Sequence, residues 1–150
     1  MKETLLVYAF LFDSAFIVDS EYREFLDEFF LKDSSDALLL ELEWHISDFQ
    51  ISKKIIFDYF RIREIDYSIF GKFLMEKLKK KYILGDMTLE NFNLNLVKIW
   101  SKLPQEIICK EPFWAMSYAG EPLSWGDAQG TRNLYEKMFN FYCAKSKMEE

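Results

Sequence analysis

The sequence is poor in the residues on which many enzymes, metal sites and sheet proteins depend. It contains one histidine, two cysteines, five glycines and three prolines in 150 residues. So few glycines and prolines argue against a many-stranded sheet with a tight turn at every corner. The cysteines, Cys109 and Cys143, lack the CxxC spacing of a metal site, and we interpret them as free thiols of a cytoplasmic protein.

Motifs for phosphate binding and nucleophilic catalysis are also missing. Neither GxxxxGK[ST] nor GxGxxG occurs, and there is no GxSxG elbow. A Ser-His-Asp or Cys-His site would have to use His45, the only histidine, as its base. Helical metal centres usually take ExxH pairs from two helices, and this chain has no second histidine. The residues therefore predict no metal site and no cofactor, and they disfavour an enzyme.

No apolar run is long enough to cross a membrane. The N-terminal run over residues 5–12 is interrupted by Asp13, and no small-residue cleavage site follows it. A membrane-spanning helix needs about 20 apolar residues. We therefore interpret this run as a buried core segment and expect no membrane partner.

Apolar and aromatic side chains, by contrast, are abundant. Half of the residues are hydrophobic and 18% are aromatic, which excludes general disorder. The net charge is −6, and residues 1–50 hold twelve Asp or Glu against three Lys or Arg. A nucleic-acid binder needs a dominant basic surface, so we expect no nucleic-acid partner.

Helical periodicity predicts an all-α fold in which residues 1–150 form one domain, a single compact bundle of about six or seven helices. Residues 5–18 fit either a helix or a strand. Ser20 is expected to cap the next helix, and the clearest pattern predicts one uninterrupted helix from Asp36 to about Phe49. Gly85 is predicted to end a later helix and Thr88 to cap the one after it.

The stretch EPLSWGDAQGTRNLYEKMFNFY, over residues 121–142, combines a proline, a tryptophan and two glycines at the start of the closing helix. Its SWGD segment matches a capping box with Ser124 as the cap, and Asp127 is the alternative cap. We interpret the stretch as a helix start in which Trp125 packs on the core. A binding role is the alternative, and the burial of Trp125 separates the two.

In overall character the chain resembles the small bacterial proteins that neutralise toxins, and bacterial families that are still uncharacterised. The resemblance is to a small, acidic, aromatic-rich helical domain with one histidine, and YAGEPLSWGDAQGTRNLYEKMF is its most family-like part. It implies a non-enzymatic protein-binding module, an immunity-type inhibitor that blocks a toxin or enzyme. It has no defined catalytic or binding motif, so no residue roles carry over.

An acidic surface lined with aromatic rings can occupy a basic cleft, because charge steers association and the rings anchor it. The candidate residues for binding a protein partner are Asp36, Glu41, Glu43, Trp44 and Asp48. Two alternatives remain open. One is a small hydrolase or ligand-binding protein with a polar pocket around His45, or between the last helix and the stretch EPFWAMSYAGEP over residues 111–122. The other is a structural subunit of a bacterial complex.

Overall fold

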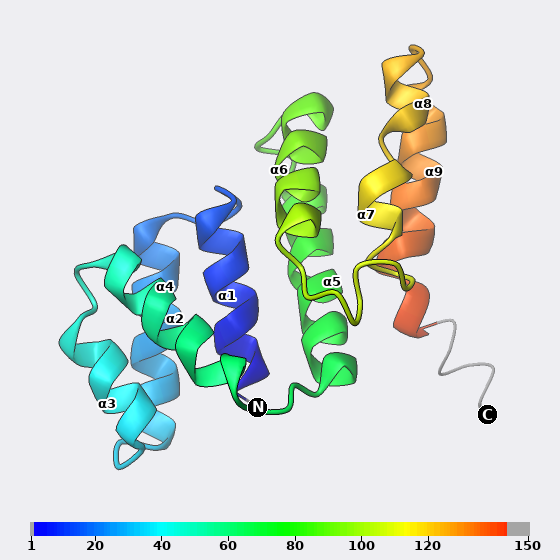
Figure 1. Cartoon of the computed structure of the whole chain (residues 1–150). Helices are drawn as coiled ribbons and strands as arrows, with labels where there is room; N and C mark the ends of the chain where they lie inside the picture. Colours follow the sequence, from blue (N-terminus) through cyan, green and yellow to red (C-terminus); the bar gives the residue numbers. More distant parts are fainter. Residues whose placement is uncertain (1, 144–150) are drawn as a thin grey trace. The chain divides into compact units, whose positions relative to one another are not determined.

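The computed structural model describes residues 2–143, which form helices and turns and include no strand (Figure 1). The predicted all-α fold class is confirmed. The chain divides into two compact units, Met1–Asp66 and Tyr67–Glu150. A division by contacts does not show that either unit folds alone, so the single domain over residues 1–150 stays a prediction.

The first unit contains α1 (Glu3–Asp13), α2 (Asp19–Lys32), α3 (Ala37–Trp44) and α4 (Phe49–Arg61). Helix α1 packs against α2 and α4, and α2 packs against α3. Residues 4–11 of α1 are all buried, so this helix is surrounded by its neighbours. A helix that is buried on every side is apolar around its whole circumference, which is why periodicity left helix and strand open here.

Two predicted helix boundaries in this unit are wrong. Helix α2 begins at Asp19 with Val18 in the N-cap position, so Ser20 lies inside the first turn and does not cap it. The expected helix from Asp36 to Phe49 is two helices, because the Asp48 carboxylate accepts the Ile51 N–H at 3.3 Å and thereby starts α4. A carboxylate that caps a new helix looks, in sequence, the same as one on a solvated helix face.

The second unit contains α5 (Tyr67–Leu84), α6 (Leu89–Ser101), α7 (Ala115–Tyr118), α8 (Glu121–Ser124) and α9 (Ala128–Phe139). Helix α9 contacts α5, α7 and α8. The predicted stop at Gly85 is confirmed by its φ of 70°, and the predicted cap is confirmed by the Thr88 hydroxyl, which accepts the Asn91 N–H at 3.1 Å. Within residues 2–143, seven helices have eight or more residues, in line with the predicted six or seven.

The aromatic side chains form much of the core of each unit. In the first unit, Phe12 and Phe49 lie 3.8 Å apart by ring centroid, and the Tyr22 ring meets Phe49 edge-on at 5.6 Å. In the second, Tyr135 is fully buried beside Phe92 at 5.4 Å. Contacts of this kind account for part of the aromatic content without any binding role.

Trp125 is an exception, and the prediction that it packs on the core is wrong. Its side chain is 77% exposed at the end of α8. The alternative cap is the one that forms, because the Asp127 carboxylate accepts the Gly130 N–H at 2.9 Å. Ser124 is not the cap, and its hydroxyl instead donates to the Glu121 carbonyl within α8. Trp125 thus lies beside a helix start without taking part in it.

Candidate functional site

Helix α3 carries apolar side chains on two opposite faces. Its inner face is buried in the first unit and consists of Leu38, Leu39 and Leu42, which are 8%, 1% and 0% exposed. The residues at the i, i+3, i+4 and i+7 positions form an outer face in solvent, and they are Ala37, Leu40, Glu41 and Trp44. We call these four residues the α3 outer face. Its two large apolar side chains, Leu40 and Trp44, are 49% and 85% exposed.

The first turn of α3 is held in place by Asp36. One oxygen of its carboxylate accepts the N–H groups of Leu38 and Leu39 at 2.9 and 3.2 Å, and the other pairs with the Lys2 ammonium at 2.6 Å. The Lys2 ammonium is the main reason that the pKa of Asp36 is lowered, and the two N–H groups add to the effect. Asp36 therefore joins α3 to α1, and its carboxylate is already satisfied within the fold.

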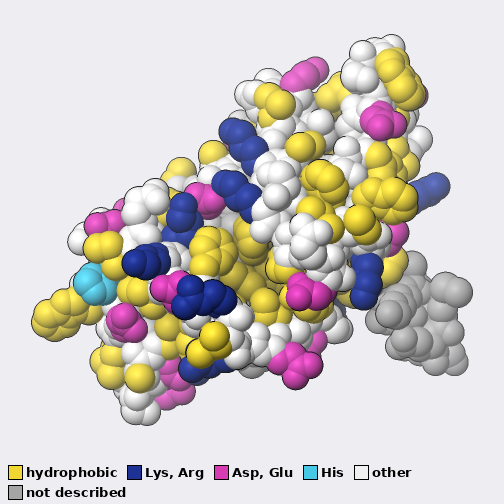
Figure 2. Space-filling view, viewed as in Figure 1, with side chains coloured by type: hydrophobic (Ala, Val, Ile, Leu, Met, Phe, Trp, Pro, Cys, Tyr) yellow, Lys and Arg dark blue, Asp and Glu magenta, His cyan; other side chains and the backbone are white. Residues whose placement is uncertain are grey.

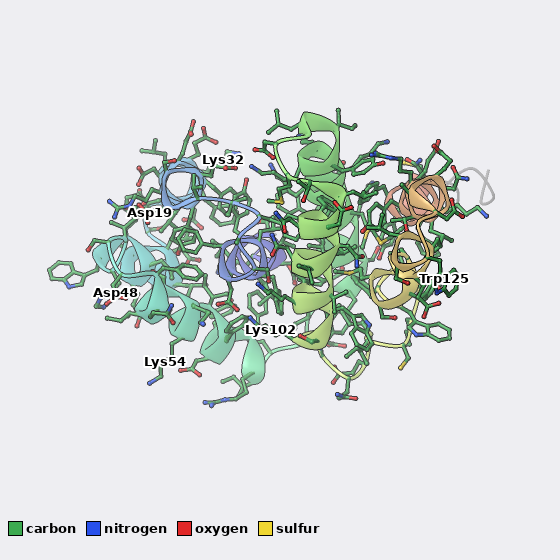
Figure 3. The ribbon with its side chains drawn as sticks, turned by 90° about the horizontal axis from the view of Figure 1, so that it is seen from above. Asp19, Lys32, Asp48, Lys54, Lys102 and Trp125 are labelled. Atoms are coloured by element: carbon green, nitrogen blue, oxygen red, sulfur yellow. The ribbon has the colours of Figure 1, made fainter. Side chains whose placement is uncertain are left out.

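The other end of α3 is fixed by the turn that leads to α4. The Ser52 hydroxyl, which is buried in α4, donates to the His45 carbonyl at 3.2 Å. Asp48 caps α4 from the same turn, and Figure 3 shows it at the connection between the two helices. Trp44 is the last residue of α3, so its backbone is constrained although its indole is exposed.

Negative charge is concentrated in the part of the sequence that contains α3. Residues 19–48, which span α2, α3 and their flanking turns, hold ten Asp or Glu against two Lys or Arg. The rest of residues 1–66 holds five of each. In Figure 2 the histidine (cyan) lies next to exposed hydrophobic side chains, with acidic (magenta) and basic (dark blue) side chains both nearby. The α3 outer face thus presents an exposed aromatic ring within a segment of the chain that has a large excess of acidic residues.

Glu43 points away from the outer face, toward α2. Its Oε1 atom is buried without a hydrogen-bond partner, and Asp27 of α2 lies beside its carboxyl group. Desolvation first, and then the hydrogen bond and charge of Asp27, raise the pKa of Glu43 to about 7. Glu43 is therefore part of the packing between α2 and α3.

The five predicted partner-binding residues consequently separate into two groups. Glu41, Trp44 and Asp48 are exposed and can meet a partner, whereas Asp36 and Glu43 are engaged inside the first unit. Sequence reasoning did not include Leu40, although its spacing of four from Trp44 on a helix was the available signal. The structure leaves the binding role of these residues as a prediction.

A pocket of about 530 Å³ lies elsewhere in the first unit, among the ends of its helices. The Tyr59 ring in its wall is covered by the Arg63 guanidinium at 3.8 Å and approached by the Lys2 ammonium at 5.5 Å. Its lining carries three cationic and four acidic side chains, so it has no clear preference for a charged ligand. No sequence motif pointed to it, because its residues come from all four helices and their connections.

The alternative of a polar pocket around His45 involves a residue that lines none of the three pockets described within residues 2–143. These are the pocket just described and two pockets of the second unit, with volumes of about 420 and 270 Å³. Within residues 2–143 no three His, Cys, Asp or Glu side chains come together as a metal site. No helix in the same range has the length and apolar character to cross a bilayer.

The chain was compared with protein-family models, with curated proteins and with solved structures. Neither a family model, nor a curated protein, nor a solved structure matches the chain.

Proposed function

We propose that this chain is a protein-binding module that docks through the α3 outer face, and that it acts as an immunity-type inhibitor of a toxin or enzyme. The observation that carries the proposal is the solvent exposure of Trp44 and Leu40 on a helix whose opposite face already fills the core. Large exposed apolar groups on a constrained helix are typical of interaction surfaces, and tryptophan is enriched among the residues that dominate binding energy.

The size of the Trp44 side chain sets the energy available to a partner. Burial of an indole removes roughly 200 Å² from water, which contributes about 5 kcal/mol before the costs of association are subtracted. The constrained ends of α3 reduce one of those costs, because the backbone that presents the ring is already ordered. Trp44 is therefore expected to be the main anchor of the interface.

The charge around the α3 outer face favours a basic partner. Ten Asp or Glu against two Lys or Arg over residues 19–48 create a negative potential that steers a cationic surface toward Trp44. The partner surface that fits is an apolar slot surrounded by Lys or Arg, such as the substrate cleft of an enzyme that acts on an anionic polymer. A protein that covers such a cleft inhibits by occlusion and needs no catalytic group of its own.

The proposal is tested by capture with the tagged full-length chain from a lysate of the source organism, followed by titration of the purified partner. Trp44→Ala is expected to weaken partner binding at least about tenfold, because the anchor is lost. Ile62→Ala removes an apolar side chain that is 79% exposed at the end of α4 and is not part of the α3 outer face, and it serves as the matched control. Equal binding by wild type and Trp44→Ala would contradict the proposed surface.

The inhibitor part of the proposal needs a separate measurement. The partner's own activity is assayed with increasing amounts of the chain, and full inhibition near equimolar ratio is expected. A partner that binds through Trp44 but keeps its activity when saturated would identify the chain as a structural subunit instead.

A further inference from the structure

The turn between α8 and α9 presents a second tryptophan to solvent, in the second unit. We call residues 121–127 the anchor turn. Trp125 occupies the C-cap position of α8, and its side chain is 77% exposed. Figure 3 shows its indole outside the ribbons of α8 and α9. The ring takes no part in the core, so the fold does not explain why a tryptophan stands here.

The backbone of the anchor turn is fixed by hydrogen bonds from both of its sides. The Pro122 carbonyl accepts the N–H groups of Trp125 and Asp127 at 3.0 and 2.9 Å. The Leu123 N–H donates to the Thr131 hydroxyl at 3.0 Å, and Thr131 of α9 is fully buried. The turn is thus bonded to the helix behind it, which holds the position of Trp125 before any partner arrives.

Gly126 within the turn and Gly130 just after it have different surroundings. A Cβ on Gly130 would lie 2.9 Å from the Pro122 Cβ, so α8 packs directly on the first turn of α9 there. Gly126 has a φ of 83° and no atom within 4 Å of the position that its Cβ would take. The turn is therefore tightly packed on its inner side and open on its outer side, next to Trp125.

The chain between Lys110 and Arg132, which includes the anchor turn, carries only acidic charged side chains. Residues 111–131 contain no Lys or Arg, and their three charged side chains are Glu111, Glu121 and Asp127. Two of these, Glu121 and Asp127, are exposed within the turn itself. Trp114 in the same stretch is 49% exposed and packs edge-on against Tyr118. The surface that complements this stretch is cationic with an apolar socket.

We propose that the anchor turn is a second protein-docking site, occupied by a partner segment that places Lys or Arg beside an apolar socket for the Trp125 indole. The site lies wholly in the second unit and uses no residue of the α3 outer face, so it does not rest on the proposed function. A chain with two such sites can hold one partner at two points or two partners at once, and avidity then exceeds the affinity of either site.

The test uses a random peptide library displayed on phage and panned against the immobilised full-length chain. Enriched peptides are expected to combine Lys or Arg with a large apolar residue. Their binding is expected to fall about tenfold with Trp125→Ala and less with Trp125→Phe, because a smaller ring still fills part of the socket. Glu121→Lys is expected to weaken peptide binding, because it removes charge attraction. The affinity that remains is expected to depend less on salt concentration than that of the wild type. Trp44→Ala is the matched control and should bind these peptides within about twofold of wild type.

Folding is monitored separately, so that loss of binding is not confused with loss of structure. Trp125→Ala should keep its melting temperature within about 2 °C of wild type, since little of the ring is buried. Enriched peptides without basic residues, or peptides that bind Trp125→Ala as well as wild type, would overturn the proposal. So would a wild-type dimer in sedimentation velocity that Trp125→Ala converts to a monomer, because the occupant would then be a second copy of the chain.

Discussion

Replacement of Leu42 by alanine is expected to lower the free energy of unfolding by about 3 kcal/mol. Leu42 is fully buried on the inner face of α3, so truncation removes buried methylene and methyl groups and leaves a cavity. The substitution weakens the packing of α3 against the first unit, because only Leu38 and Leu39 remain as large side chains of its inner face. Denaturation by urea with a fluorescence or circular-dichroism readout measures the change.

The same helix supplies a matched control in Leu40→Ala. Leu40 is the same residue type two positions away, but it lies on the outer face and is 49% exposed. Its truncation is expected to cost under about 1 kcal/mol in stability, because water already occupies part of its surroundings. It should instead weaken partner binding at the α3 outer face. Equal stability losses for the two variants would show that α3 does not have one inner and one outer face.

Helix ends could be predicted from the sequence where they depend only on neighbouring residues. Gly85 and Thr88 act through a positive φ and a side-chain cap, both of which depend on a few neighbouring residues. Ser20 is also a good capping residue, but Val18 and Asp19 start α2 first. Helix α2 therefore begins without a side-chain cap, so the presence of a good capping residue does not by itself show where a helix begins.

The burial of individual side chains could not be predicted from the sequence. Trp125 and Tyr135 both follow apolar patterns near the same helix, yet one is 77% exposed and the other is fully buried. The difference depends on contacts with α5 and α6, which lie far away in sequence. Glu43 and Glu41 likewise look equivalent as acidic helix residues, and only the position of α2 separates them. Trp44 was a candidate because it lies among acidic residues; its side chain is 85% exposed, and its binding role stays a prediction.

The packing of Glu43 against Asp27 makes the stability of the protein depend on pH in an unusual direction. The pKa of Glu43 is raised from an ordinary 4.5 to about 7, so the folded protein keeps a proton that the unfolded chain loses. The contribution of Glu43 to the free energy of unfolding is then highest below about pH 4.5, falls between about pH 4.5 and 7, and stays constant above pH 7. The cost above pH 7 is about 1–3 kcal/mol, because the partly buried carboxylate must be ionised next to another acidic group.

Glu43→Gln is therefore expected to stabilise the protein by about 1–3 kcal/mol near pH 8, and to leave stability almost unchanged near pH 4.5. The amide is neutral at every pH and can still form a hydrogen bond with Asp27. Asp27→Asn should reproduce part of the gain, since it removes the charge but not the desolvation of Glu43. Glu41→Gln, on the exposed side of the same helix, is the matched control and should leave the dependence on pH as in wild type. Urea denaturation at several pH values gives the slopes. The prediction would be contradicted if the unfolding free energy of the wild type rose between about pH 4.5 and 7 and that of Glu43→Gln rose with the same slope. The Glu43 carboxyl group would then not face Asp27 across the contact between α2 and α3.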